Sequence, residues 1–151
     1  MLDQFSEGGI VVDKAIGFWV SRVYQRSRTE MYRLFREHGE DITPEQWMVL
    51  IRLWEQEGPL QGELCESTFR DAPTMSRILA TMESRGLVER RVAPDDGRAR
   101  RVFLTKHGRA LQKKLVPLVR GLVENMARGI EARDLATTRR TLERMFENLG
   151  P

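Results

Sequence analysis

Residues 71–86 combine an apolar stripe with small or hydrogen-bonding side chains, a combination suited to close contact with another molecule. The apolar residues recur at helical spacing and predict a helix with one buried face; they are Met75, Ile78, Leu79 and Met82. The opposite face carries Thr74, Ser76, Arg77, Ala80 and Thr81. A surface helix selected for solubility alone would more often carry Glu and Lys there. We therefore expect this face to approach a binding partner closely.

A second chemical cluster lies in residues 93–99, which are rich in turn formers. They separate two extended runs, at 87–92 and 100–104, so the pattern predicts a β-hairpin. Its tip is basic and presents Arg98, with Arg100 close behind.

The charge of the chain is unevenly distributed. The 151 residues have a net charge of +3, whereas residues 85–114 alone carry ten Lys or Arg against three acidic residues, which gives +7. Such a block is a plausible electrostatic footprint for nucleic acid. A solvated charged face is the other interpretation, and composition favours neither.

Three further helices are expected before the hairpin, in addition to the one that starts at Asp71. Helical periodicity predicts a long helix over residues 13–37 that ends at Gly39. The second begins at Thr43, because Thr43 and Gln46 can form a capping box around Pro44. It ends at Gly58-Pro59, and a short third helix spans about 61–67. The fourth, capped by Asp71, ends at Gly86.

Two helices are expected after the hairpin. Thr105 can cap a helix over about 106–128, which Pro117 should kink or locally break. Asp134 can cap a last helix over 135–148. Apolar stripes on the first and the last two helices predict buried positions, among them Ile16, Val20, Val23, Phe35, Leu111, Leu115, Leu118, Leu122, Met126, Leu135, Leu142, Met145, Phe146 and Leu149.

This order of elements is that of a winged helix-turn-helix, so the expected fold class is mainly α with a small β wing. A B-DNA major groove admits one helix, whose N-terminal part reaches the base edges. Here that part begins at Pro73. Thr74 and Ser76 could bond phosphates or bases, and Arg77 could pair with guanine or phosphate. The exposed N-terminal amides would add a phosphate site, and Arg98, with Arg100, would lie over the backbone or in the minor groove.

Residues 60–108 closely resemble the DNA-binding core of the MarR (multiple antibiotic resistance regulator) transcription factors. The motifs that carry the resemblance are Pro73-Thr74-Met75-Ser76-Arg77, Glu83-Ser84-Arg85-Gly86-Leu87-Val88-Glu89-Arg90, Asp96-Gly97-Arg98 and Leu104-Thr105-Lys106-His107-Gly108. The flanking helices match the family layout in length and order.

The resemblance implies a homodimer on double-stranded DNA with a pseudo-palindromic operator, usually a repressor that a small ligand releases. Residues 1–40 and 105–151 would form the dimerisation region, and residues 41–104 the DNA-binding domain. Arg98 matches the family's minor-groove arginine, and Asp96 the aspartate that orients it. Gly97 stands where many members carry a second arginine, and Pro117 is an unusual proline in the dimerisation helix.

An effector of unknown identity is part of what the resemblance implies. Aromatic and apolar residues between 19 and 54 could line its pocket, with core or dimer packing as the alternative for each; they are Trp19, Val23, Met31, Phe35, Trp47, Met48, Ile51 and Trp54. Arg22, Arg26 and Arg28 could anchor an anion or face solvent. An aromatic or other organic acid, or a thioester, is the class we expect.

The single cysteine, Cys65, could suggest an oxidant sensor, but Leu64, Glu63 and Glu66 beside it disfavour a thiolate, so we expect an inert thiol. His38 and His107 lack metal-ligand spacing, so neither a metal nor another cofactor is expected.

Several other classes of protein are disfavoured. No apolar run approaches the length of a membrane span, and no signal peptide is visible, which predicts a cytoplasmic protein without membrane contact. No catalytic constellation occurs at meaningful spacing, so an enzyme is not expected. The alternative function is a winged-helix protein that acts through protein contacts or non-specific architectural DNA binding.

Overall fold

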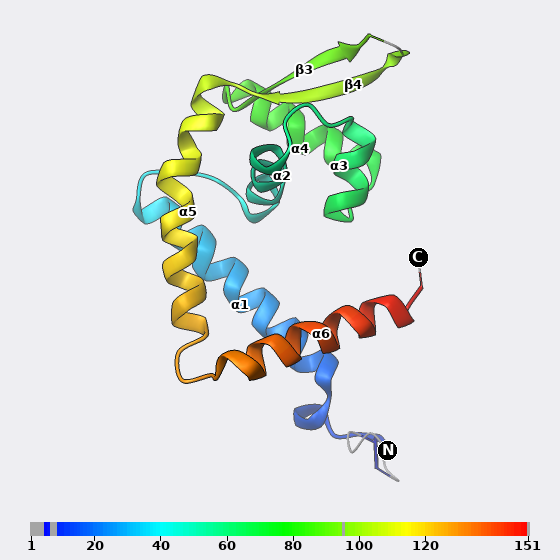
Figure 1. The fold of residues 1–151 in the computed structure, drawn as a ribbon, viewed down its shortest axis with the longest axis vertical. Helices are drawn as coiled ribbons and strands as arrows, with labels where there is room; N and C mark the ends of the chain where they lie inside the picture. The colour runs from blue at the N-terminus through cyan, green and yellow to red at the C-terminus, as the bar shows by residue number, and fades with distance from the viewer. Residues whose placement is uncertain (1–4, 7–8, 95, 151) are drawn as a thin grey trace. The chain divides into compact units, whose positions relative to one another are not determined.

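The computed structural model describes residues 5–6, 9–94 and 96–150, and it is mainly helical with one β wing (Figure 1). The elements are β1 (Phe5–Ser6), β2 (Gly9–Ile10), a 3-10 turn (Val12–Lys14), α1 (Ile16–Glu37), α2 (Pro44–Glu55), α3 (Gln61–Thr68), α4 (Ala72–Ser84), β3 (Val88–Ala93), β4 (Asp96–Leu104), α5 (Lys106–Met126) and α6 (Ala132–Asn148). They form two compact units, Met1–Leu118 and Val119–Pro151.

The helix starts follow local side-chain chemistry, as predicted. Thr43 accepts a hydrogen bond from the Gln46 amide at 3.2 Å, and the Gln46 side chain accepts one from the Thr43 amide at 3.2 Å. Asp71 caps α4, and Thr105 Oγ1 accepts from the Gly108 amide at the start of α5. Gly39 and Gly86 have positive φ at the ends of α1 and α4, which confirms them as stop signals.

Three boundaries differ from the prediction. A 3-10 turn and an extended Ala15 precede α1, which therefore begins at Ile16 rather than at residue 13. The helix α5 continues through Pro117, so the predicted local break is wrong; one missing amide removes one hydrogen bond without ending the helical path. The helix α6 begins at Ala132, and Asp134 lies in its first turn, where a carboxylate is favourable without being the cap.

The wing is an antiparallel pair in which Val88 faces Leu104 and Val92 faces Arg100. The register then shifts by a bulge, and Ala93 pairs with Asp96, so β4 begins four residues before the predicted strand. The short β1–β2 ribbon was not predicted. In Figure 1, the hairpin lies against the group formed by α2, α3 and α4.

The core of the first unit lies among α2, α3, α4, the wing base and the first half of α5. Met75, Leu79 and Met82 are fully buried, as the stripe on α4 predicted, and Ile78 is half-buried. The close approach of α5 to the wing requires a glycine, because a Cβ on Gly108 would lie 2.1 Å from the Leu87 carbonyl oxygen.

The outer apolar stripes are not buried within the chain. On α1 only Phe35 is fully buried, whereas Ile16, Val20 and Val23 are 42–52% exposed. On α5, Leu111 and Leu115 are buried, Leu118 and Leu122 half-buried, and Met126 exposed. On α6, exposed residues include Leu135, Leu142, Met145, Phe146 and Leu149. The predicted burial is wrong for the exposed positions, because an amphipathic pattern does not reveal whether its own chain covers the stripe.

Candidate nucleic-acid interface

One exposed stripe runs along α4 opposite the core residues. Its members are uncharged apart from one guanidinium; they are Pro73, Arg77, Ala80, Thr81 and Ser84. Thr74 and Ser76 lie half-buried at its margins. Because the small side chains do not hold a partner away from the helix, the stripe can enter a groove, with Arg77 as its single cation.

The Asp71 carboxylate caps the N-terminal turn of α4. Asp71 accepts a hydrogen bond from the Thr74 amide at 2.7 Å and another from the Thr74 hydroxyl at 2.9 Å. These bonds, first the amide and then the hydroxyl, hold the pKa of Asp71 below its ordinary value, so the cap is ionised at neutral pH.

This geometry reduces the number of free N-terminal amides that the predicted phosphate site could use. Pro73 has no N–H group, and the Thr74 amide is already bonded to Asp71. The ionised Asp71 would also repel a phosphate. Pro73 and Thr74 therefore offer no free amide to a ligand at this end of α4.

Hydroxyl groups further along α4 bond to the helix itself. Thr81 donates to the Arg77 carbonyl oxygen at 3.1 Å, and Ser84 donates to the Thr81 carbonyl oxygen at 2.8 Å. The single hydroxyl proton of Thr81 is thereby used, so toward a nucleic acid Thr81 can act as an acceptor.

The wing tip is braced by its own side chains. Asp96 accepts a hydrogen bond from the Arg98 backbone amide at 2.9 Å. Arg100 donates to the Gly97 carbonyl oxygen at 3.2 Å and the Ala99 carbonyl oxygen at 3.4 Å. Asp96 thus fixes the backbone at Arg98, while Arg100 folds back onto the turn. Arg98 is exposed and is the tip residue best placed to reach DNA.

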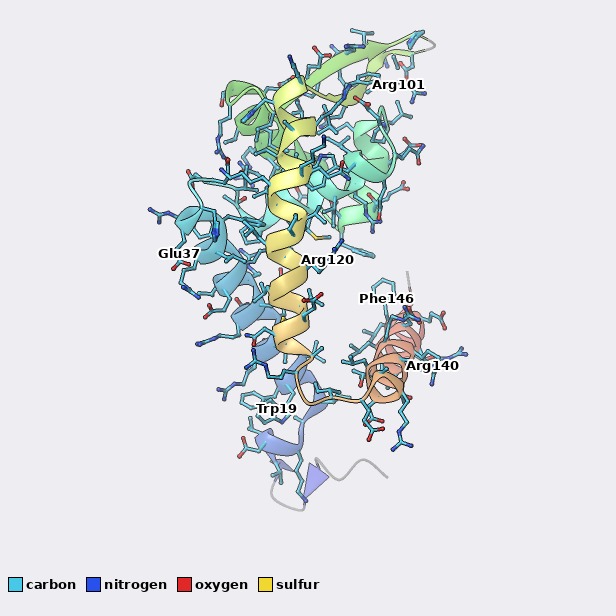
Figure 2. The ribbon with its side chains drawn as sticks, turned by 60° about the vertical axis from the view of Figure 1, so that its left-hand side comes forward. Trp19, Glu37, Arg101, Arg120, Arg140 and Phe146 are labelled. Atoms are coloured by element: carbon cyan, nitrogen blue, oxygen red, sulfur yellow. The ribbon has the colours of Figure 1, made fainter. Side chains whose placement is uncertain are left out.

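Most of the other cations in the basic block are bound within the protein. Arg85 donates to the Gln46 side chain and to the Asp41 backbone carbonyl oxygen, and Arg101 (Figure 2) donates to the Gly58 carbonyl oxygen. Arg91 stacks on Phe103 and pairs with Glu89, Arg109 pairs with Glu57, and Lys114 pairs with Glu40. The segment charge of +7 therefore overstates the charge available to a ligand. Arg98 is an exposed cation at the tip of the wing, and Arg77 is the cation on the exposed stripe of α4.

One ion pair joins the wing to α4. The Arg90 guanidinium donates to Glu83 at 2.6 and 3.0 Å, and the Arg90 amide donates to the other carboxylate oxygen at 3.0 Å. The hydrogen bond from the Arg90 side chain is the main reason that the pKa of Glu83 lies below its ordinary value. Both guanidinium nitrogens donate to Glu83 Oε2 and the amide donates to Oε1, so three hydrogen bonds fix β3 relative to the exposed stripe.

The residues predicted for an effector pocket fall into two groups. Trp47 is buried and packs against the Phe35 and Trp54 rings, with Ile51 half-buried on the same helix. Trp19 and Val23 are exposed near the start of α1. Trp19 and Phe35 are sixteen residues apart, roughly 24 Å along the helix axis, and Figure 2 shows Trp19 and Glu37 at opposite ends of α1. One chain alone therefore does not bring the two groups together.

A polar cluster that sequence reasoning missed joins α1 to α2 and to the turn before α4. Arg28 donates to Tyr24 at 3.3 Å and to Glu45 at 2.5 Å. Hydrogen bonds from Arg28 and Arg70 lower the pKa of the Tyr24 phenol below its ordinary value, with Arg28 the larger cause. The i, i+4 spacing of Tyr24 and Arg28 was a usable signal, whereas nothing local pointed to Glu45 or Arg70.

Other candidate chemistry finds little support. Cys65 is half-buried, and burial, followed by Asp71, raises the pKa of its thiol, which disfavours a thiolate. Within residues 5–6, 9–94 and 96–150, no three His, Cys, Asp or Glu side chains gather as metal ligands. A cleft of about 350 Å³ lies between α2 and α3 and has both polar and apolar walls; it is lined by Arg52, Glu55, Gln56, Pro59, Glu63, Leu64 and Ser67.

Comparison with known proteins identifies the arrangement. Residues 40–99 match the model of the MarR family. The transcriptional regulator HosA of Escherichia coli O111:H- is 31% identical over 96 residues, which cover 59% of this chain and 71% of HosA. The chain belongs to the MarR family. It is a DNA-binding transcriptional regulator rather than an enzyme.

Solved MarR structures share the fold over most of the chain. A MarR regulator from Methanosarcina mazei is 27% identical, with a TM-score of 0.78 and coverage of 88% of this chain and 94% of that one. The repressor CouR, solved bound to a 23-mer DNA duplex, is 25% identical, with a TM-score of 0.75 and coverage of 93% and 95%. No helix in the described part of the chain is long and apolar enough to cross a membrane.

Proposed function

We propose that this MarR regulator is a homodimeric, cytoplasmic repressor that binds a pseudo-palindromic operator and is released by a small organic anion. The observation that carries the proposal is the pairing of a small-residue stripe on α4, with Arg77 as its cation, and a braced wing that presents Arg98. CouR, which shares this fold, was solved bound to a DNA duplex, and this supports DNA binding by the present chain.

The dimer is inferred from apolar surface left uncovered on helices at both ends of the chain. Ile16, Val20 and Val23 are exposed on α1, and Leu142 and Phe146 on α6. Large apolar side chains in regular stripes are typical of an interface. We assign residues 1–40 and 105–151 to this dimerisation region, and residues 41–104 to DNA binding.

In the proposed complex each α4 lies in a major groove and each Arg98 reaches the minor groove beside it. Two-fold symmetry then requires half-sites about one helical turn, or ~10 bp, apart. Arginine is favoured in a narrow minor groove because the electrostatic potential there is more negative. Ser76 and Thr81 complete the contacts with phosphates or base edges, and Thr74 lies beside Arg77 with its hydroxyl oxygen accepting a hydrogen bond from the guanidinium.

DNA binding is tested by fluorescence anisotropy on the promoter DNA next to the regulator's own gene. We expect a dissociation constant of about 10 nM and a steep loss of affinity with salt. A footprint should show one symmetric protected site. Equal affinity for promoter and random duplex, without a discrete footprint, would instead support the architectural function.

The proposed effector is an aromatic carboxylate or a related thioester. Arg22 lies over the Phe18 and Trp19 rings at 5.3 and 5.6 Å, so cation and aromatic surface occur together on α1. The Tyr24–Arg28–Arg70 cluster provides further donors suited to a carboxylate. Because Trp19 and Trp47 lie apart in one chain, a pocket that uses both needs α1 of the second protomer.

The effector is tested with a panel of benzoate, hydroxycinnamate and aromatic thioester ligands. A true effector should raise the melting temperature of the protein and release operator DNA over the same concentration range. Aliphatic acids of equal charge serve as controls. If no compound does both, ligand control in this form is wrong, while the DNA-binding result stands on its own.

A further inference from the structure

A series of hydrogen bonds runs along the first two turns of α4 and ends at Arg77, the only cation exposed on that helix. The Thr74 hydroxyl donates to Asp71 Oδ2 at 2.9 Å, and Arg77 Nη2 donates to the Thr74 hydroxyl oxygen at 3.3 Å. All three residues lie at the N-terminal end of the stripe, the part of a recognition helix that reaches base edges.

The direction of these hydrogen bonds follows from which groups can donate a proton. A threonine hydroxyl has one proton and two lone pairs. Because the ionised Asp71 only accepts, the Thr74 proton points toward Asp71 and its lone pairs are left for Arg77. Asp71 therefore selects the threonine rotamer that receives the arginine, and the guanidinium is drawn toward the helix N-terminus.

The charge of Asp71 also acts on a bound duplex. A carboxylate at the tip of α4 repels any phosphate that approaches, whatever the sequence, and this opposes non-specific binding. A bidentate contact from an oriented arginine to guanine increases affinity only for DNA that has that base pair at the contacted position. The repulsion lowers affinity for operator and random DNA alike, so the difference between the two comes from the oriented arginine.

We propose that Asp71 is a positioning residue that acts through Thr74 on Arg77 and sets the ratio of operator affinity to random-duplex affinity. This inference rests on the proposed DNA-binding mode and adds to it a determinant of specificity. Asp71 thus has a role beyond capping, one that a neutral cap of equal strength cannot fill.

We call the action of Asp71 through Thr74 on Arg77 the relay. It is tested with Thr74→Val, which removes the Thr74 hydroxyl and keeps the shape of the side chain and the backbone cap. We expect operator affinity to fall about tenfold, which is the lower part of the range for one bidentate base contact, with little change on random duplex. Thr74→Ser should restore binding. Thr141→Val, which removes a similar helix-bonded hydroxyl on α6, is the matched control and should bind as wild type.

A double-mutant cycle separates the relay from a direct contact of Thr74 with DNA. If Thr74 acts through Arg77, Thr74→Val has no further effect once Arg77 is alanine. If Thr74 binds DNA directly, the two losses add, and the relay is wrong. Loss of the guanine preference at one operator position in both single variants would support the relay.

The role of the Asp71 carboxylate is tested with Asp71→Asn, because asparagine caps a helix as well as aspartate does. We expect tighter binding to random duplex, a lower operator-to-random ratio and an unchanged melting temperature. An unchanged ratio would overturn the role assigned to Asp71. Failure of the proposed function itself is distinct, since the wild-type protein would then show a ratio near one.

Discussion

Arginine has two roles in this chain, and the neighbouring groups decide which one each residue takes. Arg90 and Arg101 bond to acceptors of the protein and hold the wing in place, whereas Arg98 is carried outward on a braced turn. The sequence alone counts these residues as one basic block. The distinction depends on acceptors such as Glu83 and the Gly58 carbonyl oxygen, which are remote in sequence or belong to the backbone, so composition could not reveal it.

Arg98→Ala tests the role of the wing at this scale. We expect operator affinity to fall about tenfold or more, because a minor-groove arginine is lost. The melting temperature and the dimer should not change, since Arg98 is exposed. Arg133→Ala on α6, which also removes an exposed cation, should leave affinity near wild type. Unchanged affinity in Arg98→Ala would remove the wing tip from the mechanism.

Phe69 is the one non-glycine residue of the described chain with positive φ, at 54°, and it is 72% exposed. A left-handed conformation costs a residue with a Cβ about 1–2 kcal/mol. Phe69→Gly should therefore raise the free energy of unfolding by about 0.5–1 kcal/mol, after allowing for the greater freedom of glycine in the unfolded chain.

Urea denaturation measures this gain. Ala80→Gly, on the exposed stripe of α4, is the matched control and should lower stability by about 1 kcal/mol. A loss of stability in Phe69→Gly would mean that contacts of the ring outweigh the backbone strain.

At the scale of elements, the sequence predicted helix starts that depend on neighbouring residues, but it did not predict features that depend on the geometry of turns and contacts between elements. Thr43, Asp71 and Thr105 cap helices where predicted, because a cap uses groups only three residues apart. Asp134 is not a cap, because α6 begins at Ala132 and places Asp134 inside its first turn. The DNA-facing helix and wing could be predicted as elements, but the bulge at Ala93 and the inward fold of Arg100 depend on the turn geometry.

The link between wing and α4 predicts a specific pH dependence. Arg90 lowers the pKa of Glu83 from its ordinary 4.5, so the pair stabilises the fold fully above that value. The contribution is lost as the pH falls below about 4.5 and through the folded-state pKa. The stability difference between wild type and Glu83→Gln should be constant near neutrality and shrink in acid.

Chemical denaturation from pH 7 to pH 3 provides the measurement. Glu143→Gln, which breaks an exposed ion pair with Arg139, should differ little from wild type at any pH. A difference for Glu83→Gln that does not change with pH would show that the ion pair is not the source of the stabilisation.

At the scale of the whole molecule, the exposed apolar stripes on α1 and α6 support the proposed homodimer. Periodicity correctly predicted that these helices have apolar faces. It does not indicate whether the same chain or a second molecule covers each face. Leu142 shows the difference: it lies on the predicted stripe of α6 and is 39% exposed.

Leu142→Glu should convert the dimer to a monomer and abolish operator binding, because a charge would have to be desolvated in an apolar interface. Light scattering coupled to size exclusion measures the mass, and circular dichroism checks the helices. Thr137→Glu, on the opposite face of α6, should remain dimeric. A dimeric Leu142→Glu variant would exclude this stripe from the interface.

The close approach at Gly108 has an evolutionary consequence. A Cβ there would collide with the Leu87 carbonyl oxygen, while Thr105 caps the Gly108 amide and Trp54 donates to the Gly108 carbonyl oxygen. Selection at this position therefore acts on the joint between wing and α5, independently of the DNA sequence bound. Descendants can therefore change their operators through substitutions on α4 without changing this joint, so Gly108 carries no information about the target genes.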